Sequence, residues 1–403
     1  MKVKNKIKKI GLGYFSLDEK AKNLITGTLE KGRISPGPIT DKFEKRFAGY
    51  HGCKFGIFTN SGTSALKIAL HALKSIHRWN DGDEVLVPAI TFVATSNIVL
   101  LNKMKPVFVD VAPETYNIDP KQIEKHITLK TRAIIPVHLF GLPAEMNEII
   151  RIAKKHKLKV IEDSCECMGV RYMNSAVGSL GDIACFSTYM AHLLVTGVGG
   201  LAITNNPQYA LKMKSLMNHG RDSIYLRIDD DDSKKGSALF EVADKRFSFI
   251  DIGYSARATE MEAALGLVEL DKLKKQIKIR QKNAVYLIQK LKPLESHIRL
   301  STVPRDREHA FMMFPVTIIS NKFKRAELIH FLENNGIETR YAMPLLNQPV
   351  YKRIFGNLEE KYPVAKFINK NSFYIGCHQG LNKDELDYIV RRFFEFFRKK
   401  KLI

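Results

Sequence analysis

Short apolar segments alternate with helical patterns between residues 54 and 204, and this alternation restricts the fold more than any other feature of the chain. Apolar runs of about four to eight residues between turn signals are typical of buried strands. Strands that alternate with helices form a mostly parallel sheet with helices on its faces, so the predicted fold class is α/β. The expected strands are residues 55–59, 84–87, 107–109, 132–138, 159–162, 183–187 and 201–204.

A long helix predicted to begin near Ala258 leads from this region into a C-terminal part of mixed strands and helices. Met261, Leu265 and Val268 have helical spacing there. The preceding residues 223–250, which include the acidic run 229–232, are predicted to form a surface loop. A chain of 403 residues can bury more than one core. We expect a large domain at residues 1–274, N-terminal arm included, and a small α/β domain at residues 275–403.

Composition excludes several classes of protein. The net charge of +22 is dispersed along the chain rather than concentrated in one patch, so we expect no nucleic acid partner, although it would attract a small anionic ligand. No segment approaches the roughly 20 apolar residues of a membrane span, and no secretory signal is present, so we expect a cytoplasmic protein without a membrane partner. The five cysteines match neither a disulfide framework nor a metal site.

Two segments have the composition of ligand-binding sites. Residues 60–66 (NSGTSAL) follow an expected strand and open a helix, where backbone N–H groups with the hydroxyls of Thr63 and Ser64 can hold a phosphate. A capped helix start without a ligand explains the same residues equally well. Asp163 ends an expected strand, a position from which a carboxylate can face a ligand in an open α/β sheet. The pair Glu162–Asp163 is also compatible with a structural role.

Together with other segments, these residues resemble the DegT/StrS-type sugar aminotransferase family. The further segments are residues 87–95 (VPAITFVAT), 161–169 (IEDSCECMG), 187–200 (STYMAHLLVTGVGG), 218–222 (NHGRD) and 252–266 (IGYSARATEMEAALG). The resemblance extends over nearly the whole chain. It implies the type I fold of pyridoxal phosphate (PLP)-dependent transferases, similar to aspartate aminotransferase, and a homodimer with shared active sites.

The resemblance also implies roles for individual residues around PLP. Gly62, Thr63 and Ser187 match positions that bind the cofactor phosphate. Phe92 matches an aromatic that stacks on the pyridine ring, and Asp163 matches the aspartate that pairs with the ring nitrogen. Glu166 stands near the cofactor where most members have glutamine. Ser255 replaces an asparagine that reaches the phosphate in the other subunit, which leaves that contact in doubt.

His192 occupies the position at which most family members carry the lysine that holds PLP covalently, and its neighbours Ala191 and Leu193 offer no substitute. Imidazole cannot form that bond but can transfer protons near neutral pH. The resemblance therefore points to the branch that uses pyridoxamine phosphate (PMP) to remove the C3 hydroxyl of a nucleotide sugar. In that branch a second histidine, here His219, lies near the first. L-Glutamate regenerates PMP.

Other segments concern the substrate. Arg340 and His378 lie in segments that resemble those facing the sugar nucleotide. One type of 3-dehydratase carries an iron–sulfur cluster with cysteines in the region that corresponds to residues 193–252, where this chain has none. We therefore expect no iron–sulfur cluster and a substrate of the GDP-linked 4-keto-6-deoxy type, either a hexose or a heptose. The product would be a 3,6-dideoxy sugar for a surface polysaccharide.

Two alternatives remain open at this point. The chain is compatible with a nucleotide-sugar 4-aminotransferase that functions with histidine in place of lysine. It is also compatible with a non-catalytic binding protein of the PLP fold. Val198 stands where most members have glutamate, and the sequence does not indicate what this replacement changes in the site.

Overall fold

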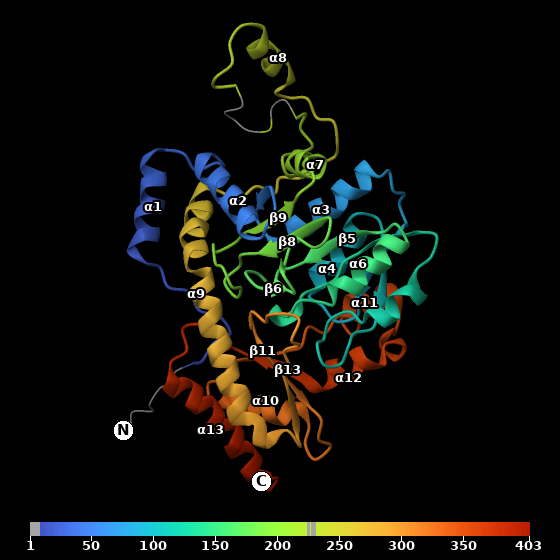
Figure 1. Ribbon diagram of the computed structural model, residues 1–403, viewed down its shortest axis with the longest axis vertical. Coiled ribbons are helices and arrows are strands. Elements are labelled where there is room, and N and C mark those ends of the chain that lie inside the picture. The colour runs from blue at the N-terminus through green and yellow to red at the C-terminus, as the bar shows by residue number, and fades with distance from the viewer. Residues whose placement is uncertain (1–8, 224–225, 227–230) are drawn as a thin grey trace.

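A seven-stranded mixed sheet forms the centre of the molecule (Figure 1). The computed structural model describes residues 9–223, 226 and 231–403. The strand order is β1-β9-β8-β5-β4-β2-β3; β9 is antiparallel to both neighbours, and all other neighbouring pairs are parallel. The predicted α/β class is therefore confirmed. The strands are β1 (Phe55–Thr59), β2 (Glu84–Pro88), β3 (Lys105–Val109), β4 (Thr131–Ile134), β5 (Lys159–Asp163), β8 (Ile183–Ser187) and β9 (Gly200–Thr204).

Six of the seven expected strands agree with the structure to within two residues, and the exception is β4. This strand was predicted over residues 132–138 but ends at Ile134. Pro136 has no N–H to donate to a neighbouring strand, which disfavours a longer ladder. The chain then makes a single bridge between Val137 and Asp163 and enters a short 3-10 turn at Leu139–Gly141. His138 consequently lies beyond the end of the strand.

Helices cover the sheet and supply most of the buried apolar surface. Helix α3 (Gly62–Ile76) packs on β8 and β9, and α6 (Met146–Lys155) packs on β5. Leu66, Ala69 and Leu73 of α3 are fully or almost fully buried because they recur at helical spacing on one face. The helices α2 (Pro38–Tyr50), α4 (Val93–Leu101) and α7 (Pro207–Met217) also contact this sheet, whereas α1 (Glu19–Glu30) packs on the helix at Glu260–Leu291.

A second, antiparallel sheet lies at the C-terminal end of the molecule (Figure 1). Its order is β10 (Ile298–Leu300), β11 (Phe314–Ile318), β13 (Ser372–Ile375) and β12 (Thr339–Tyr341), and it has its own hydrophobic cluster with α10 (Arg325–Asn334) and α13 (Lys383–Lys399). Helix α9 (Glu260–Leu291) begins within two residues of the predicted start and extends on both sides of residue 274. The domain boundary at that residue stays a prediction.

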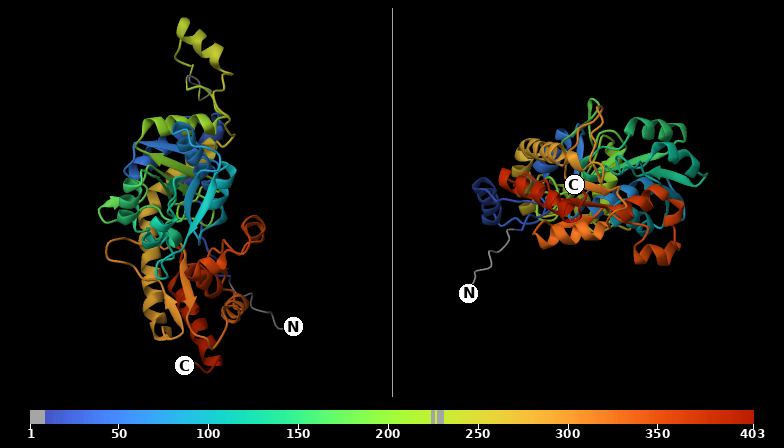
Figure 2. Two further views of the ribbon diagram at one scale, coloured as in Figure 1. Left: turned by 90° about the vertical axis from the view of Figure 1, so that its right-hand side faces the viewer. Right: turned by 90° about the horizontal axis from the view of Figure 1, so that it is seen from below.

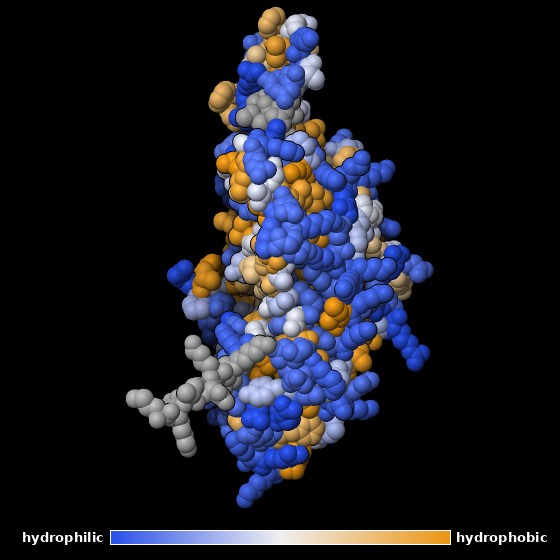
Figure 3. Space-filling model, turned by 90° about the vertical axis from the view of Figure 1, so that its left-hand side faces the viewer, coloured by the Kyte–Doolittle hydropathy of each residue, from blue (hydrophilic) through white to orange (hydrophobic). Residues whose placement is uncertain are grey.

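A segment of the chain projects from the body beyond α7 and carries α8 (Ser237–Lys245) (Figures 1 and 2). The predicted loop at residues 223–250 was therefore wrong in part, because residues 237–245 form a helix after Gly236, whose φ of 56° suits glycine. Asp229 and Asp230 of the acidic run lie outside the described residues. Apolar side chains are visible on the projection (Figure 3), and Phe240, Phe247, Ile250 and Ile252 are at least 60% exposed.

Within the described ranges, no helix combines the length and hydropathy needed to cross a membrane. The same ranges contain no group of three histidine, cysteine or acidic side chains arranged to hold a metal ion. All five cysteines are free thiols.

Candidate active site

A cavity of about 670 Å³ lies at the carboxyl ends of the parallel strands, between the first turn of α3, the start of α4 and the segment 187–199. This is the edge at which open α/β sheets bind ligands. Segments from the C-terminal part, including Arg340 of β12 and Tyr374 of β13, complete its wall. Eight of the eleven predicted site residues line the cavity, namely Gly62, Thr63, Phe92, Asp163, Glu166, Ser187, His192 and Arg340.

The start of α3 supplies donors for an anionic group. The Ser61 side chain caps the helix by accepting a hydrogen bond from the Ser64 N–H over 3.1 Å, whereas the N–H groups of Gly62 and Thr63 precede the first intrahelical bond. A Cβ at Gly62 would lie 2.8 Å from the Ser187 Cβ, so only glycine fits beside the end of β8. The Ser64 hydroxyl, which we expected to join the cradle, donates instead to the Asn60 side chain over 2.7 Å.

Phe92 presents an unusually exposed aromatic ring to the cavity. It is the residue before α4, and 58% of its surface is exposed although its neighbour Thr91 is buried. An aromatic ring that faces a cavity offers a flat surface for a planar ligand. The location agrees with the predicted stacking role, which stays a prediction.

Asp163, the last residue of β5, points its carboxylate into the cavity. Thr95 donates a hydrogen bond to Oδ2 over 2.7 Å, and the Cys165 N–H donates to Oδ1 over 3.2 Å. Burial raises the pKa of Asp163, while these hydrogen bonds oppose the shift. In the described part of the chain no lysine or arginine forms an ion pair with Asp163. A cationic group of a ligand would therefore relieve its desolvation.

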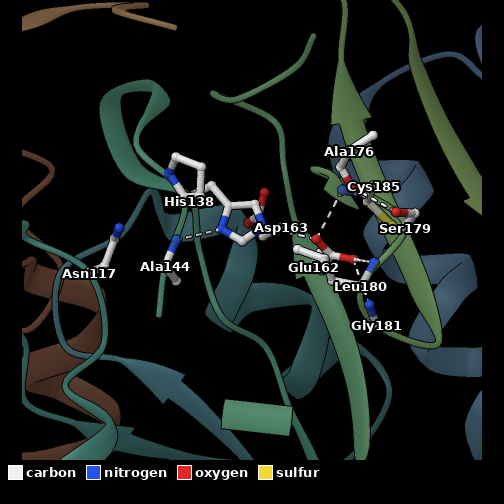
Figure 4. Close-up of polar contacts among 12 residues, drawn as sticks. Asn117, His138, Ala144, Glu162, Asp163, Ala176, Ser179, Leu180, Gly181 and Cys185 are labelled. Carbon is white, nitrogen blue, oxygen red and sulfur yellow. Dashed lines mark hydrogen bonds and ion pairs between the residues drawn. The ribbon is translucent and has the colours of Figure 1, made fainter. Parts of the chain in front are cut away.

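The pair Glu162–Asp163 was compatible with a ligand-binding or a structural role, and Glu162 has the structural one. It accepts hydrogen bonds from the backbone N–H groups of Gly178, Leu180 and Gly181 and from His138 Nε2 (Figure 4). His138 Nδ1 accepts a hydrogen bond from the Ala144 N–H, so the imidazole proton is on Nε2, which donates a hydrogen bond to Glu162. Neighbouring residues of a strand face opposite sides. Glu162 therefore anchors the loop at 178–181, and Asp163 faces the cavity.

Glu166 brings a second buried carboxyl group to the cavity. It is 6% exposed, and its Oε2 accepts a hydrogen bond from the Phe140 N–H over 2.6 Å. Burial, with a smaller contribution from the Asp163 charge, raises the pKa of Glu166 to about 7. Of the two acids, Asp163 has the larger number of hydrogen-bond donors.

His192 lies in the turn that follows β8 and lines the cavity. Its Nδ1 atom is buried and has no hydrogen-bond partner within the described residues. Burial lowers the pKa of His192 to about 4, and the charge of the buried Arg280 acts in the same direction. The imidazole is thus neutral at physiological pH and able to accept a proton. Gly197 and Gly199, with φ of 91° and 146°, form the turn that returns the chain to β9, and glycine tolerates these backbone angles.

Three predicted site residues do not line the cavity in the single chain. His219 and Ser255 are both exposed and are joined through Arg257, whose Nη2 lies 3.4 Å from His219 Nε2 and donates to the Ser255 hydroxyl over 3.1 Å. His219 is therefore not part of the cavity that His192 lines in the single chain, and its proximity to His192 stays a prediction. His378 is buried, and its ring stacks on Tyr14 with a centroid distance of 5.8 Å. It is one residue removed from the cavity, because Tyr14 is the lining residue.

Sequence reasoning missed the N-terminal contribution to the cavity wall. Residues 11–15 line it, held by backbone hydrogen bonds from Ile10 to Gly336 and from Glu338 to Ile10. We call residues 11–15 the strap. A Cβ at Gly13 would lie 3.0 Å from the Met190 carbonyl oxygen, so the strap passes close to the turn that carries His192. Gly11 and Gly13 were the only hint in the sequence that this segment approaches other backbone, but their spacing matches no dinucleotide fingerprint. A contact between residues so far apart in the sequence leaves no local pattern that could predict it.

The cavity fits a planar, phosphorylated, cationic-ring cofactor such as PLP or PMP. The first turn of α3 offers N–H groups that precede the first intrahelical bond to a phosphate, and the exposed ring of Phe92 offers a stacking surface. The buried Asp163 has no lysine or arginine partner among the described residues. These three features come from different elements and converge on one cavity.

Comparison with known proteins agrees with this fit. Residues 16–394 match the model of the DegT/DnrJ/EryC1/StrS aminotransferase family. GDP-perosamine synthase of Caulobacter vibrioides is 32% identical over 358 residues, which cover 88% of this chain and 89% of the relative. The dTDP-4-dehydro-2,6-dideoxy-D-glucose 3-dehydratase of Saccharopolyspora spinosa is 31% identical over 388 residues, which cover 93% of this chain and 84% of the relative.

Among solved structures, the E. coli GDP-4-keto-6-deoxy-D-mannose 3-dehydratase with bound hydrated PLP superimposes with a TM-score of 0.87. The sequences are 26% identical, and the match covers 96% of this chain and 99% of the other. The predicted type I fold of PLP-dependent transferases is thereby confirmed. The chain belongs to the DegT/DnrJ/EryC1/StrS aminotransferase family of PLP-dependent enzymes, whose members include both sugar aminotransferases and sugar dehydratases.

Proposed function

We propose that this enzyme is a PMP/PLP-dependent nucleotide-sugar C3-dehydratase. The observation that carries the proposal is His192, a neutral, partly buried imidazole in the cavity at the family's lysine position. A base without a primary amine can move protons but cannot retain the cofactor covalently. The 3-dehydratase of Saccharopolyspora spinosa and that of E. coli support the assignment as relatives.

The cavity residues divide the chemistry among them. When bound, PLP or PMP supplies an electron sink that makes the bonds next to its amine carbon labile. Asp163 holds a negative charge at the ring-nitrogen position and is itself held by Thr95 and Cys165. Phe92 and the first turn of α3 orient the ring and the phosphate. His192 accepts a proton and returns it, which its low pKa permits at neutral pH.

The proposed substrate is a GDP-linked 4-keto-6-deoxy hexose or heptose, converted to a 3,6-dideoxy sugar for a surface polysaccharide. Two relatives are named for GDP-linked sugars, which supports this nucleotide. Arg340 lines the cavity from β12 and forms an ion pair with Glu338, so its guanidinium is positioned for an anionic group. L-Glutamate is the proposed donor that restores PMP.

We further propose a homodimer with shared active sites. His219 and Ser255 are exposed and lie outside the cavity of their own chain. The projection around α8 exposes Phe240, Phe247 and Ile252, an apolar surface that a second copy would cover. In such a dimer each chain would contribute His219 and Ser255 to the site of its partner.

A nucleotide-sugar 4-aminotransferase is the second candidate, because GDP-perosamine synthase is a relative of similar identity. A His192→Lys variant separates the two functions. We expect this variant to lose 3-deoxygenation and to gain the absorption of covalently bound PLP. If His192→Lys removed the C3 hydroxyl as fast as the wild type, the proposed role of His192 would be wrong. An Ala191→Lys variant controls for adding an amine beside the site.

A further inference from the structure

Two buried carboxyl groups line the cavity near the end of β5, and their surroundings differ. Asp163 is 4% exposed and receives hydrogen bonds from the Thr95 hydroxyl and the Cys165 N–H. Glu166 is 6% exposed and receives one, from the Phe140 N–H. Asp163 is the last residue of β5, and Glu166 lies three positions further along the chain. Carboxylates in a shared apolar site do not both ionise readily, and the one with fewer donors keeps its proton.

The other ionisable groups that act on Glu166 leave this balance unchanged. Besides Asp163 they are the thiols of Cys165 and Cys167 and the phenol of Tyr374, and burial raises the pKa of each of these three. They are therefore neutral near pH 7. Arg340, which also lines the cavity, is paired with Glu338. Glu166 is thus the cavity carboxyl group whose pKa is raised to about 7, so it can hold a proton near neutral pH and also release it.

His192 is poorly suited to donate the same proton. Its imidazole is neutral at neutral pH because its pKa is lowered to about 4. A neutral imidazole accepts a proton readily, whereas it becomes a good acid only after it has accepted one. A second group that is already protonated and faces the same cavity can donate a proton without first having to accept one.

We propose that Glu166 is the general acid that protonates the departing C3 hydroxyl, while His192 acts as the base. This inference rests on the proposed function. When the C3–O bond breaks, its electron pair stays on the oxygen, and the proton of Glu166 converts it to water. The electron pair that replaces it comes from the C–H bond that His192 deprotonates. The step leaves a Glu166 carboxylate and a protonated His192, and proton exchange with solvent restores both.

A Glu166→Gln variant tests this role because the amide keeps the size and polarity of the side chain but cannot transfer its proton. The wild type and the variant are loaded with PMP and compared for removal of the C3 hydroxyl. The conversion of PLP to PMP by L-glutamate, which expels no hydroxyl, is measured for both. We expect dehydration to fall by about 100-fold or more beyond any change in the glutamate reaction. An equal loss in both reactions, or full dehydration, would overturn the inference. Glu148→Gln, an exposed position on α6, is the matched control.

The protonation of Glu166 has a readout independent of turnover. Infrared spectra of the full chain without cofactor should contain the carbonyl band of a neutral carboxylic acid at pH 6. This band should fade as the pH rises through about 7 and should be absent from Glu166→Gln. If no such band is present at pH 6, Glu166 is ionised and is not the acid. A wild type that aminates its substrate would overturn both the proposed function and this role.

Discussion

The Thr95 hydroxyl lies 2.7 Å from the Asp163 carboxylate and points its proton at Oδ2. Thr91 lies 2.7 Å from the same Thr95 oxygen. Because Thr95 uses its only proton on the carboxylate, Thr91 must be the donor to Thr95. The start of α4 thereby holds the end of β5, and the charge of Asp163 is fixed at the floor of the cavity.

Replacing Thr95 with valine should weaken cofactor binding. The change keeps the shape of the side chain but removes a donor to a buried carboxylate, and hydrogen bonds to charged groups contribute about 1.5–3 kcal/mol. We expect PLP to bind about 10-fold more weakly or worse, as measured by titration of the cofactor absorbance. Thr95→Ser retains the hydroxyl and should bind normally. Equal affinities of the valine and serine variants would show that the hydrogen bond is irrelevant.

A methyl group at Gly62 should close the phosphate cradle. The new Cβ would meet Ser187 Cβ at 2.8 Å and Cys165 Sγ at 2.9 Å, so the helix start must shift. We predict that Gly62→Ala loses at least about 10-fold in PLP affinity, since charge-assisted bonds depend on close alignment. The same substitution at Gly27 in α1, where nothing lies within 4 Å, should leave binding intact and should stabilise the fold by about 0.5–1 kcal/mol.

The pH dependence of kcat/KM should reflect both titratable groups. The lowered pKa of His192, about 4, means that the base is lost only as the pH falls through that value, well below the ordinary 6.5 of histidine. The raised pKa of Glu166, about 7, means that the acid is lost as the pH rises through neutrality. We expect activity between these limits and the absence of the alkaline limb in Glu166→Gln. An acidic limb near 6.5 would contradict the burial of His192.

Shared active sites predict complementation between two inactive variants. His192→Asn removes the base of its own cavity, and His219→Asn removes a residue proposed to act in the partner's cavity. Mixing both variants at equal concentration, after dissociation and reassociation, should restore about a quarter of the wild-type sites if subunits pair at random. Activity that remains at the level of the separate variants would place His219 outside the partner's site. The dimer itself is checked by light scattering.

Much of the large sheet could be predicted because its strands are short apolar runs between turn signals. Residues 55–59 and 183–187 became β1 and β8 with the predicted bounds. The site residues Gly62, Asp163 and His192 were found because each lies next to such a strand, in a segment with a characteristic order of residues. The apolar runs predict where the strands end, and ligands bind at the carboxyl ends of strands in an open α/β sheet, so the same pattern also locates the site.

The remaining features depend on contacts between distant segments. The strap at residues 11–15 reaches the cavity only because Ile10 pairs with Gly336 and Glu338, more than 300 residues away. The positions of His219 and Ser255 outside the cavity follow from the three-dimensional path of the chain, which their local sequence does not encode. Helix α8 was missed because it does not bury a continuous apolar face: Val242 is 1% exposed, whereas Phe240 is 66% exposed.

The most direct test of the proposed function is the mass of the product. The protein is incubated with PLP, L-glutamate and GDP-4-keto-6-deoxymannose, and the nucleotide sugar is analysed by mass spectrometry. The proposal predicts a product that has lost the C3 oxygen and kept the C4 ketone. A product in which an amine has replaced the ketone oxygen would identify an aminotransferase and contradict the role assigned to His192.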